Sequence, residues 1–209
     1  GLVFPIVEED ILCDPIDIPT HWPRLCGIDF GWDHPTAVVW IAWDRDTDIV
    51  YIYDCYAMRQ ETVPVHASAI NGRGKWIPVV WPMDGRQADK GSGKSLTEQY
   101  RKEGVNMLRD HFSNPSSNGM KEGSGGNSVE AGIMEILTRM QTKRLKIFRN
   151  QSKLLEELRM YHRKDGKIVP AHDDVISAMR YCVMSLRKAR IKNYQPMQFQ
   201  TDSEFNVFK

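Results

Sequence analysis

Four aspartates stand where a fold could bring acidic side chains together. Asp29 ends a short apolar segment, Asp84 follows the apolar run Ile77–Trp81, and Asp173 and Asp174 open a long segment with helical apolar periodicity. Acidic side chains resist burial unless they are paired or bind a metal ion. Because strand ends and a helix start can converge on one crevice of a mixed sheet, the sequence predicts that these carboxylates form one site.

Carboxylate oxygens are hard ligands that suit Mg²⁺ or Mn²⁺. Two such ions, about 3.5–4 Å apart, stabilise both the attacking and the leaving oxygen of a phosphodiester. The set therefore predicts metal-dependent phosphodiester hydrolysis with two ions, bridged by Asp29 because its strand is central. Each aspartate also has a structural alternative. Asp29 and Asp84 could be turn residues, and Asp173 could cap a helix that has Asp174 in its first turn.

Two neighbouring features have weaker claims to chemistry. His172, directly before the acidic pair, is a candidate to orient the nucleophilic water or contact the scissile phosphate, or it is an ordinary polar residue at a helix start. The segment Gly91–Ser95 (GSGKS) resembles the end of a phosphate-binding P-loop, but Ala88 stands where that motif needs glycine. We therefore expect no ATP site, although Lys94 remains a candidate for contact with DNA phosphate.

Charge is unevenly distributed along a chain whose net charge is only +1. Residues 1–70 carry twelve acidic and three basic side chains, whereas residues 139–167 carry ten basic and three acidic ones. This asymmetry favours a cation site beside a face that binds a polyanion, although a solvated helix face would give the same pattern. We expect the basic stretch to lie near the carboxylates and to contact DNA backbone without reading sequence. Its candidates are Lys143, Arg144, Lys146, Arg163 and Lys164.

The expected secondary structure is that of an α/β protein with a mixed sheet. Three successive strands with short turns predict an antiparallel meander, and two later apolar runs predict parallel strands between helices. The meander strands are Leu25–Asp29, Thr36–Trp43 and Ile49–Tyr56, and the later strands are Ile77–Trp81 and Leu145–Phe148. Helices are predicted at Val63–Asn71, Ser95–Glu103, Val129–Thr142, Ser152–Tyr161 and Asp173–Arg187, with a tight turn at Asp165–Gly166.

Length and composition predict one compact domain. The chain has 209 residues, 41% of them hydrophobic, which suffices for a substantial core. We divide it into an extended entry segment or linker at 1–21, a folded domain at 22–190 and a flexible tail at 191–209. The Gly- and Ser-rich insert Ser113–Asn127 is expected to be mobile and to help regulate access. The four cysteines lack metal-site spacing, and no signal peptide or membrane-spanning run is evident.

The motifs together resemble the nuclease domain of the large terminase subunit of tailed bacteriophages, especially those that package by the headful mechanism. The pieces that carry the resemblance are Gly27–Ala37 (GIDFGWDHPTA), Trp81–Gly85 (WPMDG), the Gly91–Leu96 loop, Tyr161–Ile168 (YHRKDGKI) and His172–Tyr181 (HDDVISAMRY). The similarity extends over about 22–188. It implies an RNase H-like fold and an acidic metal site at Asp29, Asp84 and the Asp173/Asp174 pair. The sequence does not decide which member of the pair binds metal, and we favour Asp174 with Asp173 in support.

The resemblance also implies a function and partners. It implies a Mg²⁺- or Mn²⁺-dependent endonuclease that cleaves concatemeric double-stranded DNA in the host cell cytoplasm. The implied partners are an ATPase motor domain of the same full-length protein, a small terminase subunit and the capsid portal, with no membrane. Two alternatives stay open: an RNase H-like junction resolvase, and a non-catalytic module that docks on DNA or the portal.

Overall fold

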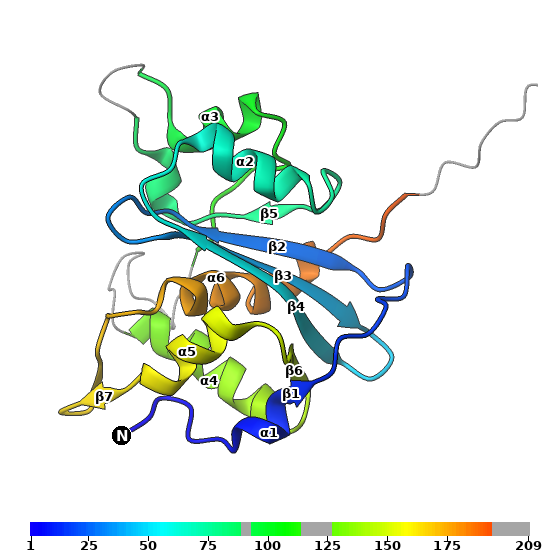
Figure 1. Ribbon diagram of the computed structural model, residues 1–209, viewed down its shortest axis with the longest axis vertical. Helices are drawn as coiled ribbons and strands as arrows, with labels where there is room; N and C mark the ends of the chain where they lie inside the picture. The colour runs from blue at the N-terminus through cyan, green and yellow to red at the C-terminus, as the bar shows by residue number, and fades with distance from the viewer. Residues whose placement is uncertain (89–92, 114–126, 194–209) are drawn as a thin grey trace, which may run out of the picture.

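The protein is built as three layers, with a central sheet between two layers of helices (Figure 1). This is a computed structural model, and it describes residues 1–88, 93–113 and 127–193. The six-stranded sheet has the order β1-β6-β4-β3-β2-β5, and a second, two-stranded sheet pairs β7 with β8. The α/β mixed sheet expected from the sequence is confirmed.

The centre of the sheet is the predicted meander. Strands β2 (Arg24–Asp29), β3 (Thr36–Asp44) and β4 (Ile49–Met58) pair antiparallel in that order. In the register, Asp29 faces Ala37 near the start of β3, while the β3–β4 turn lies at the other end of that strand. At about 3.3 Å per residue, roughly 20 Å separate these two ends of the sheet.

Three short strands extend the sheet in parallel. Strand β5 (Val79–Val80) pairs with β2, β6 (Leu145–Phe148) pairs with β4, and β1 (Leu12–Cys13) pairs with β6. The apolar run at 77–81 is buried as expected, but only two of its residues form a strand. Prolines 78 and 82 explain this, because they flank the strand and lack the amide hydrogen that a ladder needs.

Helices cover both faces of the sheet, each over its own apolar cluster. Figure 1 shows α2 and α3 on one face and α4, α5 and α6 on the other. The helices match their predicted positions within a few residues, except that the predicted helix at 173–187 ends at Val183 and is followed by a short 3-10 turn. The bounds are α2 Val63–Asn71, η1 Met83–Arg86, α3 Leu96–Lys102, α4 Asn127–Gln141, α5 Ser152–Met160, β7 Arg163–Lys164, β8 Lys167–Ile168, α6 Asp174–Val183 and η2 Leu186–Lys188.

The segment 1–21 is not simply extended, and that expectation was wrong. It forms the short helix α1 (Glu8–Ile11) and strand β1, and it buries Val3, Phe4 and Ile11 in the main apolar cluster. The burial of these apolar side chains holds the segment against the domain, although its acidic composition is typical of a linker. Most of the predicted mobile insert and tail, at 114–126 and 194–209, lies outside the described residues. Within the described part of the chain, no helix is long and apolar enough to cross a membrane.

Candidate metal centre

Asp29 sits where helix α6 packs directly on strand β2. The contact is made at Gly27, where a Cβ atom would lie only 2.5 Å from the Ala178 carbonyl oxygen and 2.7 Å from Cys182 Sγ. Only a residue without a side chain allows this approach. Two residues further along β2, the Tyr181 hydroxyl of α6 donates a hydrogen bond of 3.2 Å to Asp29 Oδ1. Close packing thus fixes Asp29 relative to the helix that begins with the acidic pair.

Asp84 lies on the short 3-10 helix η1, which a second glycine holds against the end of β2. A Cβ atom at Gly85 would lie 2.5 Å from Thr97 Oγ1 and 2.8 Å from the ring of Phe30, the residue after Asp29. The Thr97 hydroxyl of α3 also donates a buried hydrogen bond of 2.9 Å to the Gly85 carbonyl. These contacts place Asp84 beside the end of β2, where its side chain is exposed.

The acidic pair begins α6, but neither member caps the helix. Asp173 occupies the N-cap position without any side-chain capping bond, so the capping role considered from the sequence does not hold. Glu157 of helix α5 accepts hydrogen bonds from Val175 N at 3.1 Å and Ile176 N at 2.9 Å. Sequence reasoning missed Glu157, because nothing local in the sequence links it to α6.

The four aspartates form one electrostatically coupled group. Burial, with the nearby Asp84, Asp174 and Asp173, raises the pKa of Asp29 to about 7 against the lowering effect of the Tyr181 hydrogen bond. Burial also raises the pKa values of Asp84, Asp173 and Asp174. Such shifts mark carboxylates that are partly desolvated and close to like charge.

These residues fit a divalent cation by the chemistry of their oxygens. A partly buried group of like charges is unfavourable unless positive charge balances it, and carboxylates are hard donors of the kind that Mg²⁺ prefers. The four carboxylates lie close enough to repel one another, but they do not form a closed set of metal ligands. Among the residues that the structure describes, no three histidine, cysteine or acidic side chains converge closely enough to hold an ion as they stand.

Several basic side chains lie near the acidic pair. His34, Arg59 and His172 each lower the pKa of Asp174, although burial outweighs them, and His34 acts on Asp173 together with Arg180. Sequence reasoning identified only His172, which is exposed and has a positive φ of 53°. The predicted meander could have revealed His34 and Arg59, because such a meander brings the end of its third strand beside the turn before its second strand. The register confirms this arrangement, since it pairs Thr36 with Met58.

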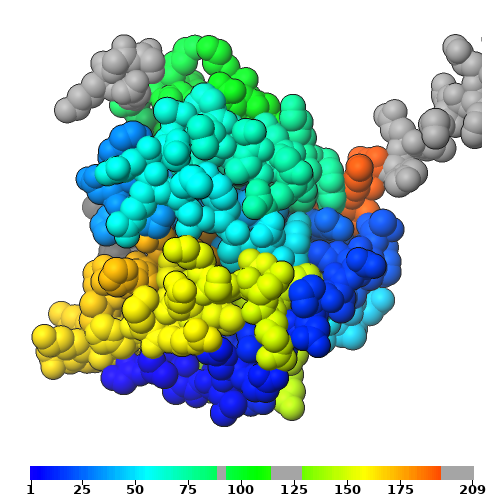
Figure 2. Space-filling model, in the orientation of Figure 1, coloured from blue at the N-terminus to red at the C-terminus, as the bar shows by residue number. Residues whose placement is uncertain are grey.

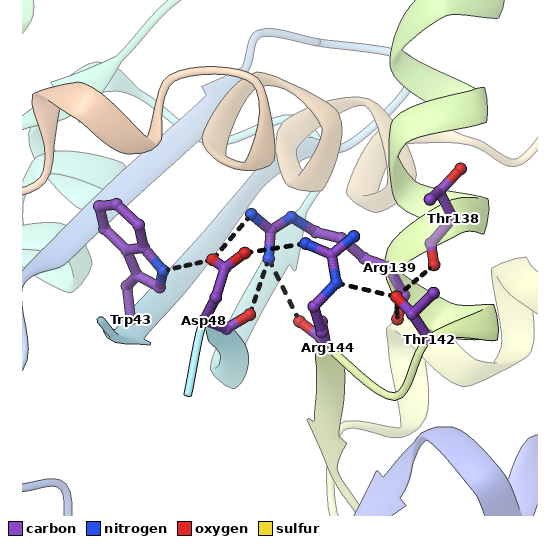
Figure 3. A network of polar contacts seen from close by, with 6 residues as sticks. All are labelled: Trp43, Asp48, Thr138, Arg139, Thr142 and Arg144. Atoms are coloured by element: carbon purple, nitrogen blue, oxygen red, sulfur yellow. Dashed lines mark hydrogen bonds and ion pairs between the residues drawn. The ribbon is translucent and has the colours of Figure 1, made fainter. Parts of the chain in front are cut away.

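The basic stretch at 139–149 does not lie near the carboxylates, and that expectation was wrong. Asp48 in the β3–β4 turn accepts from Arg144 Nη1 at 2.8 Å and from Arg139 Nη2 at 3.1 Å (Figure 3). Lys146 Nζ donates to the Asp10 carbonyl oxygen at 2.7 Å. Lys143 immediately precedes Arg144. Strand β6 starts at the β3–β4 end of the sheet, so this charge gathers a strand length away from Asp29.

Of the remaining DNA-contact candidates, two lie on the β7–β8 hairpin, which leads into the segment before the acidic pair. Arg163 is held by Glu130, with Nη1–Oε1 at 2.6 Å and Nη2–Oε2 at 2.7 Å, whereas Lys164 is exposed. Figure 2 shows the hairpin projecting from the surface at the lower left. Lys94 lies just before Ser95, the N-cap of α3, and α3 packs against η1. These three candidates therefore remain closer to the acidic end of the domain.

The sheet order and the acidic group at the end of β2 define an RNase H-like domain of the kind found in terminases. Residues 26–186 match the family model of the terminase RNase H-like domain, and the chain belongs to that family. It is 40% identical over 192 residues to the large terminase subunit of Salmonella phage P22, covering 91% of this chain and 37% of that protein. The large terminase subunit of Enterobacteria phage LP7 is also 40% identical, over 88% of this chain and 37% of that protein.

Solved structures agree with this assignment. The P22 large terminase nuclease domain superposes with a TM-score of 0.79 at 40% identity, covering 91% of this chain and 95% of that one. The large terminase nuclease of thermophilic phage G20c with bound magnesium shares the fold, with a TM-score of 0.58 at 17% identity over 88% of this chain and 97% of that one. The chain spans about a third of the length of the curated relatives it matches, namely their nuclease part.

Proposed function

We propose that this domain is a Mg²⁺- or Mn²⁺-dependent endonuclease that cuts concatemeric double-stranded DNA during viral genome packaging. One observation carries the proposal. Asp29, Asp84, Asp173 and Asp174 come from three separate elements, yet the last three all raise the pKa of Asp29. A stable fold rarely gathers four partly desolvated carboxylates unless a cation completes the site. The relationship to terminase nuclease domains supports DNA as the substrate class.

Each aspartate has a distinct part in the proposed site. Asp29 would be the principal ligand of the ions, because it comes from the central meander. Asp84 would add a ligand from η1 and Asp174 would add one from the start of α6, with Asp173 in support. Bound ions would supply a nucleophilic water at neutral pH and positive charge for the departing 3′ oxygen. The Tyr181 hydroxyl restricts the rotation of the Asp29 carboxylate through its hydrogen bond.

DNA would approach the acidic end of the sheet rather than the basic cluster at Asp48. His34, Arg59 and His172 are exposed and close enough to influence Asp174. Their N–H donors suit phosphates on either side of the scissile bond, and Lys164 on the hairpin and Lys94 before α3 extend this surface. His172 is the proposed contact with the scissile phosphate. Contacts of this kind hold the backbone and carry no sequence information.

The assembly around the domain is part of the same proposal. Since the curated relatives are nearly three times as long as the matched region, we place this domain in a protein that also carries an ATPase motor. A small terminase subunit and the capsid portal would be its other partners, in the cytoplasm of the host cell.

The test is digestion of supercoiled plasmid by the parent domain and by Asp29→Asn in Mg²⁺, Mn²⁺ or EDTA. We expect the parent to cut with either metal and not in EDTA. Asp29→Asn should lose more than about 100-fold in rate, because even an outer-shell change at a metal site typically costs 10–100-fold. Its DNA binding, measured by fluorescence anisotropy in EDTA, should remain.

Asp33→Asn is the matched control, because Asp33 is exposed in the neighbouring turn and should cut like the parent. A parent domain that binds DNA but cuts with neither metal would instead support the docking module. Strong preference for branched over linear duplex DNA would support the junction resolvase.

A further inference from the structure

Helix α6 is capped by a side chain that does not belong to it. The amides of Val175 and Ile176 are the second and third of the helix, the two that an N-cap side chain normally binds. Glu157 of α5 occupies both, with Oε1 accepting from Val175 N at 3.1 Å and Oε2 from Ile176 N at 2.9 Å. Glu157 is 9% exposed, so these bonds form in a largely dry environment.

Asp173 occupies the position that should supply this cap, and it has a residue type that is well suited to do so. Its backbone departs from the extended conformation of an ordinary N-cap, with φ −130° and ψ 22°, and its side chain makes no capping bond. His172 before it has the positive φ of 53°, a conformation that costs free energy in a residue with a side chain. The local chain is thus arranged so that Asp173 does not bind its own helix.

We propose that Glu157 is a positioning residue that keeps Asp173 available to the metal site by occupying the amides that Asp173 would otherwise bind. The inference rests on the proposed function, since it assigns a purpose to an unused N-cap. Glu157 is not itself a ligand in this arrangement, because both of its oxygens are engaged by the helix. Its two hydrogen bonds at the helix N-terminus replace those that a capping aspartate would accept.

Removal of Glu157 therefore has a specific consequence beyond lost stability. In Glu157→Ala, the two amides lose their partners, and Asp173 holds the N-cap position from which a carboxylate can replace Glu157. A carboxylate that turns to cap its helix no longer contributes to ion binding. We expect the Mg²⁺ concentration for half-maximal cutting to rise by about 10–100-fold, the usual effect of losing an outer-shell partner.

The experiment is a double-mutant cycle on that Mg²⁺ concentration, with parent, Glu157→Ala, Asp173→Asn and the double variant. If Glu157 acts through Asp173, Glu157→Ala raises the value about tenfold or more in the parent and by less than about twofold in the Asp173→Asn background. Glu157→Gln keeps one accepting oxygen and should fall between parent and Glu157→Ala. Glu156→Ala is the control, because Glu156 is the exposed neighbour on the same helix and should leave the value unchanged.

The outcomes separate this inference from the proposed function. A parent that does not cut with any metal rejects the proposed function. A parent that cuts, combined with a Glu157→Ala variant that unfolds at lower temperature but keeps the parent Mg²⁺ requirement, overturns the inference alone and leaves Glu157 a purely structural cap. Equal Mg²⁺ shifts in both backgrounds also overturn it. Where Glu157→Ala does not fold, the same cycle is run with Glu157→Gln and judged by the same criterion.

Discussion

Asp29→Asn should stabilise the metal-free domain. A shift of the Asp29 pKa from 3.8 to about 7 means that ionising this carboxylate in the folded protein costs about 4 kcal/mol at neutral pH, relative to the unfolded chain. Asparagine has nearly the same shape and can still accept the Tyr181 hydrogen bond, but it carries no charge. Since water reaches part of the side chain and the repulsion is shared among four groups, we expect about half of that value, or about 2 kcal/mol.

The effect has a definite pH dependence. Because the folded pKa is above the unfolded one, the contribution of Asp29 to stability is fully present below pH 3.8 and is lost as the pH rises to about 7. In EDTA at pH 8, Asp29→Asn should therefore unfold at a temperature about 4–8 °C above the parent. The difference should fall as the pH is lowered, to roughly half at pH 5, and approach zero only below pH 3.8. Excess Mg²⁺ should raise the unfolding temperature of the parent but hardly that of the variant.

Thermal unfolding followed by circular dichroism measures all three conditions, with Asp33→Asn as a control that should show none of these differences. Our reasoning would be refuted by an Asp29→Asn variant that is no more stable than the parent in EDTA at pH 8. A stabilisation that is the same at pH 5 and pH 8 would refute it as well. Either result would show that the carboxylates are not a repulsive cluster in the absence of metal.

Three further changes probe other parts of the structure. Gly85→Ala should lower the free energy of unfolding by about 1–3 kcal/mol, because its Cβ would meet Thr97 and Phe30. It should also weaken cutting by displacing Asp84. Urea unfolding measures the first effect and plasmid digestion the second. Deletion of residues 1–21 should lower stability by about 5 kcal/mol, since three apolar side chains lose their burial, and a deletion that unfolds like the parent would contradict this. Arg59→Ala should weaken DNA binding several-fold more than Lys146→Ala, as measured by anisotropy at low salt, and the reverse order would place the DNA on the opposite end of the sheet.

The sequence was sufficient for most of the architecture because the signals are local. Alternating and continuous apolar runs identified the meander and the strand β6, and periodicity identified the helices of both layers. The turn predicted at Asp165–Gly166 is confirmed, because both residues have the positive φ that an Asp-Gly turn requires. Strand β1 was not predictable, because its two residues pair only with β6, which lies far away in the chain.

The four aspartates of the site could be predicted from the sequence, but the residues that contact their elements could not. An acidic residue after a buried strand is visible in a sequence, whereas the partners Tyr181 and Glu157 depend on how α5 and α6 pack. The error over the basic stretch has a similar origin. Charge density along the sequence does not reveal toward which end of the sheet a segment runs, and β6 begins at the far end, where Asp48 neutralises Arg139 and Arg144.

The contacts at Gly27 and Gly85 limit how this domain can respond when it takes up an ion. Helix α6 cannot move closer to β2, and η1 cannot move closer to Phe30, because the backbone at both glycines already touches its neighbours. The carboxylates must therefore close around a cation mainly by rotation of their own side chains. Rotation of the exposed Asp84 takes nanoseconds or less, and ion loading should need no slow rearrangement of the main chain.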